Sequence, residues 1–174
     1  MSGKNILSLL RGGDRRMIGL SERAAAMVSC QPNLFPDLIA GLWSADEVVR
    51  MRAADACEKI TRGHPQFLQP HKRKLLALMA EARQQELRWH LAAMAPRLSL
   101  TPKERRAAIA SLLSYLQDRS SIVKTFALQG LAELAQKEPA IRGRVLRLLI
   151  EASKNGTPAM KVRSRKLLAK FDGV

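Results

Sequence analysis

Basic side chains are the most abundant chemically active groups in this sequence, and the chemistry open to them is anion binding. The 174 residues include 30 Lys and Arg against 15 Asp and Glu, which gives a net charge of +15 and a pI near 10.9. Solubility alone seldom needs such an excess. The balance indicates a polyanionic partner such as nucleic acid, an anionic membrane surface or an acidic protein.

The excess charge is concentrated in two segments of the chain. Residues 70–106 carry a net charge of +6 and residues 141–174 carry +7, so 13 of the 15 net charges come from these two segments. Residues 1–69 contribute only +2, and charges balance in residues 107–140. In the first segment, HKRK (71–74) and PKERR (102–106) are expected to open the first helices of two successive helical units, whose basic clusters could stack into one ridge.

No pattern of residues predicts catalysis or a metal site. The histidines show neither HExxH spacing nor a cluster with cysteine. Cys30 and Cys57 lack an obvious histidine base, and we expect two buried thiols rather than a disulfide or a nucleophile. Gly12–Gly13 lacks the Lys-Ser/Thr of a P-loop, so we expect a helix-ending turn there. The three histidines considered are His64, His71 and His90. The sequence therefore predicts no enzyme activity, no cofactor and no metal.

An apolar residue followed by a basic one recurs at nearly constant spacing. The steps between successive basic residues are 38, 36 and 39 residues, and apolar residues mostly follow each pair at helical spacing. A second apolar helix is expected before each pair. The pattern predicts a repeated unit of two helices; the pairs are Val49-Arg50, Leu87-Arg88, Val123-Lys124 and Val162-Arg163.

Composition and turn signals predict that these elements are all helical. Good helix formers dominate, and aromatic residues make up only 4% of the chain. Thr101 to Glu104 and Ser44 to Glu47 are each predicted to form a capping box at a helix start, and Thr157–Pro158 predicts another N-cap. The predicted helices are about 12 to 18 residues long with connections of about 3 to 6, as in antiparallel helix pairs.

Units of 36 to 39 residues that carry Asp-x-x-Val-Arg-x-x-Ala-Ala early in the second helix resemble HEAT repeats. The best match is DEVVRMRAADA, Asp46 to Ala56, and the resemblance covers roughly residues 5–171. It implies an all-α, right-handed α-solenoid of about five antiparallel helix pairs, in a single domain over residues 1–174. A plain helical bundle with accidental spacing is the alternative. The units are residues 5–31, 35–63, 70–98, 102–137 and 141–171.

The resemblance also implies roles for the basic residues. In HEAT proteins the second helices line the concave face, and the Arg of the pair usually hydrogen-bonds the Asp of the turn. Arg50 has Asp46 for this purpose, whereas the matching positions of the later units hold Gln84, Ser120 and Ala159. The charges of the later cations must then be met by water, by other acids or by a partner. The candidate anion-binding residues are Arg88, Lys124 and Arg163, with Lys72, Arg73, Lys74, Arg105, Arg106, Lys161, Arg165 and Lys166.

These features predict a non-enzymatic helical-repeat scaffold that binds a polyanion. Aromatic residues are too few for base stacking, so phosphate contacts to duplex nucleic acid fit better than recognition of single strands. The alternative is a scaffold that docks an acidic protein or peptide on its concave face, and charge alone does not separate the two.

A third, less supported function comes from another resemblance. HEAT-like repeats also build DNA glycosylases that excise alkylated bases with Trp and Asp side chains, and this chain has Trp43 and Trp89. We expect both to be buried between repeats instead. The apolar stretch from Ile6 to Leu10 is too short for a signal peptide and no membrane span is predicted, so a soluble cytoplasmic protein is expected.

Overall fold

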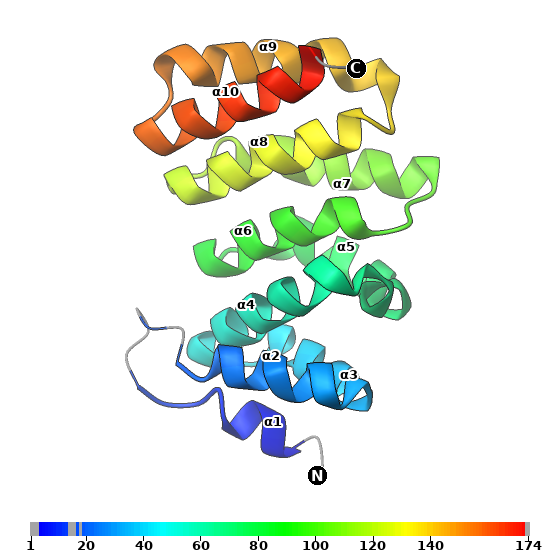
Figure 1. Ribbon diagram of the computed structural model, residues 1–174, viewed down its shortest axis with the longest axis vertical. Coiled ribbons are helices and arrows are strands. Elements are labelled where there is room, and N and C mark those ends of the chain that lie inside the picture. Colours follow the sequence, from blue (N-terminus) through cyan, green and yellow to red (C-terminus); the bar gives the residue numbers. More distant parts are fainter. Residues whose placement is uncertain (1–3, 14–16, 18, 173–174) are drawn as a thin grey trace. The chain divides into compact units, whose positions relative to one another are not determined.

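The computed structural model describes residues 4–13, 17 and 19–172, and every regular element within them is helical (Figure 1). The prediction of an all-α fold is therefore confirmed. Short 3₁₀ turns connect several of the helices. The α-helices are α1 (Lys4–Ser8), α2 (Ser21–Cys30), α3 (Phe35–Ala40), α4 (Glu47–Gly63), α5 (Lys72–Glu81), α6 (Gln85–Met94), α7 (Pro102–Tyr115), α8 (Ser121–Ala135), α9 (Pro139–Asn155) and α10 (Pro158–Asp172).

The chain divides into two compact units, residues 1–72 and residues 73–174. Two α-helices fall, within about two residues, in each of the five segments that the sequence marks as repeats. The continuous single domain over residues 1–174 stays a prediction. Among the described residues, no helix has both the length and the apolar character needed to cross a membrane.

Helix α4 is the centre of residues 1–72. Its fully or nearly buried stripe comprises Val49, Ala53, Cys57 and Ile60, spaced at the helical period. Helices α2 and α3 and the 3₁₀ segment Pro65–His71 pack against α4. Burial raises the pKa of the Cys57 thiol, which makes it inert at neutral pH.

The other predicted buried thiol, Cys30, is exposed, and this expectation was wrong. The buried stripe of α2 runs through Ser21, Ala24 and Val28. Cys30 follows Val28 by two residues, which places it off that stripe on the solvent side of the helix.

Helix α8 occupies the centre of residues 73–174. It packs against α6 and α10, and α7 and α9 also contact it (Figure 1). Gly130 permits the close approach of α6, because a Cβ added there would lie 2.8 Å from the carbonyl oxygen of Ala92. Because α10 also packs against α8, side chains of these two helices can line one groove.

The helix starts follow the predicted signals with one correction. Thr101 and Glu104 form the predicted capping box, and Thr157 caps α10 by accepting a hydrogen bond from the Met160 amide. The predicted box beginning at Ser44 is wrong, because Asp46 is the N-cap and accepts from the amides at positions 48 and 49. A carboxylate one residue before the helix reaches these amides directly and meets the positive end of the helix dipole.

Candidate functional site

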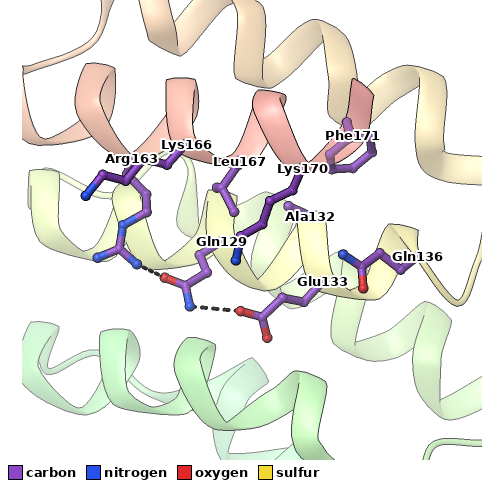
Figure 2. A pocket seen from close by; sticks show the side chains of 9 residues that line it. All are labelled: Gln129, Ala132, Glu133, Gln136, Arg163, Lys166, Leu167, Lys170 and Phe171. Atoms are coloured by element: carbon purple, nitrogen blue, oxygen red, sulfur yellow. Dashed lines mark hydrogen bonds between the residues drawn. The ribbon is translucent and has the colours of Figure 1, made fainter. Parts of the chain in front are cut away.

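A groove of about 310 Å³ lies between α8 and α10, and three cations line it (Figure 2). Three cations project from α10, at positions separated by three and four residues, and therefore share one helical face. Polar side chains of α8 face them, together with a few apolar ones. The lining residues are Arg163, Lys166, Leu167, Lys170 and Phe171 of α10, with Gln129, Ala132, Glu133 and Gln136 of α8.

Arg163 is fixed in the groove by neighbours from α8. Its Nη1 donates to the side-chain oxygen of Gln129, and its guanidinium lies over the Phe126 ring, 5.6 Å from the ring centre. The amide nitrogen of Gln129 in turn donates to Glu133 Oε1 over 2.8 Å, which Figure 2 shows as a chain of two hydrogen bonds. The orientation of the guanidinium is therefore set by a neutral amide and an aromatic face rather than by a carboxylate.

Lys166 and Lys170 are exposed, and in the described part of the chain neither forms a hydrogen bond or an ion pair. Lys170 extends toward α8 in Figure 2. Glu133 is the single acid among the described residues that line the groove. The groove thus holds three cations against one carboxylate, and two of the cations have no partner in the part of the chain that the structure describes.

Arg88 was predicted to belong to the same row, but its charge is met inside the protein. Its Nη1 lies 2.6 Å from Oδ2 of Asp118, its Nε donates to the carbonyl oxygen of Ala82, and its guanidinium lies over the Tyr115 ring. Asp118 lies two residues before Ser120, which is the position where the HEAT resemblance would place the Asp of the following unit. Of the outcomes expected for Arg88, internal pairing with another acid is the one observed.

The charge of Arg50 is also met within the turn, although not as the HEAT pattern implies. Its Nη1 donates to the carbonyl oxygens of Ser44 and Ala45, and its Nη2 lies 3.6 Å from Glu47. The carboxylate of Asp46 caps the helix instead. Both Arg50 and Arg88 therefore donate to the carbonyl oxygen six residues earlier in the chain.

Lys124 is half-buried and contributes to the positive potential at Asp118. Burial by itself would raise the pKa of Asp118, but the Ser120 amide and Arg88 donate hydrogen bonds to the carboxylate, and the charges of Arg88 and Lys124 add to their effect. The net result is a pKa below the ordinary value for aspartate. Lys124 does not line the groove between α8 and α10.

The remaining predicted residues are distributed over several elements. Arg105 is held by carbonyl oxygens at positions 100 and 137 and by the Glu138 carboxylate at 3.0 Å. Lys72, at the start of α5, is half-buried and has a partner. Arg73, Lys74, Arg106 and Arg165 are exposed and Lys161 is half-buried, and none of these five lines the groove. Of the eleven predicted residues, only Arg163 and Lys166 lie in it.

The groove also contains functional candidates that the sequence did not single out. Lys170 follows Arg163 by seven residues, a helical spacing that was available in the sequence. Gln129 and Glu133 come from the preceding helix pair, and their role depends on which faces of α8 and α10 meet. No local signal in the sequence reports that pairing.

The two tryptophans differ in burial. Trp89 is half-buried rather than buried as expected, and it packs against Phe126 of α8, with ring centres 5.0 Å apart. The expected burial of Trp43 was wrong, because its side chain is 43% exposed. It ends the 3₁₀ turn Gly41–Trp43, in which Gly41 and Leu42 take the inward positions. No group of three or more potential metal ligands occurs in the described ranges.

No model of a known protein family matches the chain, and no curated protein is significantly similar to it.

Proposed function

We propose that this chain is a non-enzymatic, HEAT-like helical-repeat scaffold that binds the phosphates of duplex nucleic acid. In this proposal the five helix pairs form a right-handed solenoid of antiparallel pairs. Two features support the repeat. The predicted segments hold two helices each, and both Arg50, through Nη1, and Arg88, through Nε, donate to the carbonyl oxygen six residues earlier.

The observation that carries the binding function is the groove between α8 and α10. Among the described residues Lys166 and Lys170 have no internal partner and are exposed in this groove, and Arg163 is positioned by neutral groups. A phosphate would supply the negative charge that these side chains lack, and an arginine held in this way retains further N–H groups for it. The net charge of residues 73–174, +12, would add long-range attraction to a polyanion.

A salt titration tests the proposal. We expect a fluorescently labelled duplex DNA of about 20 base pairs to bind, with the logarithm of the association constant falling against the logarithm of salt concentration with a slope of roughly −4 to −6, for about five to seven neutralised phosphates. Fluorescence anisotropy at salt concentrations between about 50 and 300 mM measures this slope. The absence of binding at the lowest salt concentration would contradict the proposal.

An acidic protein or peptide is the second candidate partner. The ion pair between Arg88 and the Asp118 carboxylate supports it, because Arg88 is one of the recurring cations. Polyglutamate of matched total charge distinguishes the two partners when it competes with the labelled duplex. If phosphate contacts dominate, we expect polyglutamate to compete much less strongly than unlabelled duplex. If the two compete equally, the acidic-protein function is favoured.

A further inference from the structure

The residues that line the α8–α10 groove support a more specific inference, which rests on the proposed function. We infer that this groove is the phosphate-binding subsite of the chain. Arg163, Lys166 and Lys170 contact the backbone of one strand, and Glu133 weakens the contact by electrostatic repulsion. The inference assigns binding to one face of α10 rather than to the basic surface as a whole.

The spacing of the three cations fits a run of phosphates. Arg163 and Lys170 are seven residues apart, which is about 10.5 Å along a helix that rises 1.5 Å per residue. One strand of B-DNA places a phosphate about every 3.4 Å along the duplex axis. A row of this length exceeds the axial rise between neighbouring phosphates of one strand, so the three cations can face more than one phosphate, with Lys166 between the ends of the row.

Arg163 is the preorganised member of the row. The Gln129 side chain and the Phe126 ring hold its guanidinium against α8, so less side-chain freedom is lost when a phosphate binds. A planar guanidinium can meet two phosphate oxygens at once, which an ammonium cannot do in the same geometry. Lys166 and Lys170 are exposed, and they supply charge rather than orientation.

Glu133 opposes binding at the same place. Its carboxylate accepts a hydrogen bond from the neutral Gln129 amide, and no cation in the described residues forms an ion pair with it. Its negative charge therefore acts on any phosphate that enters the groove. Glu133→Gln removes that charge while it preserves the size of the side chain and its ability to accept from Gln129.

The test compares basic residues that share a helix and occupy different faces of it. Lys166→Ala and Lys170→Ala each remove one charge from the groove, and Arg165→Ala removes one exposed charge of the same helix outside it. We expect each groove variant to lose about eight-fold in affinity for the 20-base-pair duplex at 0.1 M salt, and to reduce the salt slope by about 0.9. Arg165→Ala should lose less than about two-fold, because it contributes only through distant, screened attraction.

Two further variants test the groove without removing a cation. Glu133→Gln should raise affinity by about two- to five-fold, since one like charge near the phosphates disappears. Arg163→Lys keeps the charge and should leave the salt slope unchanged, while affinity falls by about three- to ten-fold because bidentate contact is lost. Far-ultraviolet circular dichroism confirms that each variant retains its helical content.

The outcomes separate this inference from the proposed function. If Arg165→Ala costs as much affinity as Lys166→Ala and Lys170→Ala, binding is spread over the basic surface, and the groove assignment is overturned while the proposed function stands. An unchanged affinity in Glu133→Gln overturns the role given to that residue. A wild-type chain that binds no duplex at 50 mM salt overturns both the proposed function and the subsite.

Discussion

Helix α4 of residues 1–72 buries charged side chains, whereas helix α10 of residues 73–174 exposes them. Arg52 is 3% exposed, and its guanidinium donates to the carbonyl oxygens of Leu10, Gly12 and Met17. On α10, by contrast, Lys166 has no internal partner in the described residues. Both helices carry several charged residues in sequence, yet those on α4 organise the fold and those on α10 are open to a ligand.

The other buried charges of α4 extend the contrast. Asp55 accepts from the Ser21 hydroxyl over 2.6 Å and lies 2.8 Å from the ammonium of Lys59, and Glu58 forms two hydrogen bonds with the Arg62 guanidinium. Residues 1–72 carry a net charge of +3 and residues 73–174 carry +12. The number of basic residues thus indicates a region, but burial and pairing decide which of them can bind an anion.

Among the variants that test this contrast, removal of the buried Arg52 guanidinium should change the free energy of unfolding most. Arg52→Ala leaves three carbonyl oxygens without their donor and should lower the free energy of unfolding by about 3 to 5 kcal/mol. Urea unfolding followed by circular dichroism measures the change. Arg52→Met retains much of the apolar stem and separates packing from hydrogen bonding. The matched surface variant Arg165→Ala should change stability by less than about 0.5 kcal/mol, and equal losses in both units would refute the distinction.

A smaller loss is expected at the backbone that packs against Arg52. Gly19 has φ +55°, and a Cβ added there would lie 2.6 Å from the Arg52 Cζ atom. Gly19→Ala should therefore cost about 2 to 3 kcal/mol, from backbone strain and from displacement of the guanidinium. Gly12 also has a positive φ, +73°, but has open space around it, and Gly12→Ala should cost about 1 kcal/mol. Similar losses in the two variants, measured by urea unfolding, would show that Arg52 does not constrain this loop.

Residues 73–174 also pair some charges internally, and the ion pair between Arg88 and Asp118 gives a pH-dependent effect. Asp118→Asn should lower the free energy of unfolding by about 2 kcal/mol at pH 7, because a charge-assisted hydrogen bond is weakened. The pKa of Asp118 in the folded state is below 3.8, its ordinary value. The stabilisation is therefore complete above pH 3.8 and disappears as the pH falls through the folded-state pKa.

Unfolding measured at a series of pH values from 7 to about 2 tests this assignment. The difference between the wild-type chain and Asp118→Asn should persist down to about pH 5 and shrink below pH 4. A difference that does not change with pH would mean that the carboxylate charge is not what stabilises the turn.

The smallest effect on stability is expected in the groove itself. Lys166→Ala combined with Lys170→Ala should change the free energy of unfolding by less than about 0.5 kcal/mol, because both side chains are exposed and have no partner in the described residues. Urea unfolding checks this, and the binding titration on the same preparation shows whether affinity falls. A loss above about 1 kcal/mol would place these lysines among the residues that support the fold.

The sequence was sufficient to predict the helical class and most helix starts, because composition and capping residues act locally. For example, the side chains of Thr101 and Glu104 each accept a hydrogen bond from the other residue's backbone amide, so this capping box forms within four residues. Arg163 and Lys166 were identified from charge and from the recurring pair. Gln129 contacts Arg163, which lies 34 residues away, and Arg52 contacts carbonyl groups that lie 35 to 42 residues away. Only the packed structure reveals these contacts.

The bond from Arg50 or Arg88 to the carbonyl oxygen six residues earlier has a consequence for how such a chain can diverge. Every residue presents the same carbonyl group, so the arginine does not require a particular side chain at the acceptor position: Ser44 serves in one turn and Ala82 in another. Substitutions at that position can therefore accumulate without breaking the bond. Because the acceptor is a main-chain group, the contact is compatible with different side chains at that position, and a sequence pattern written in side chains does not report it.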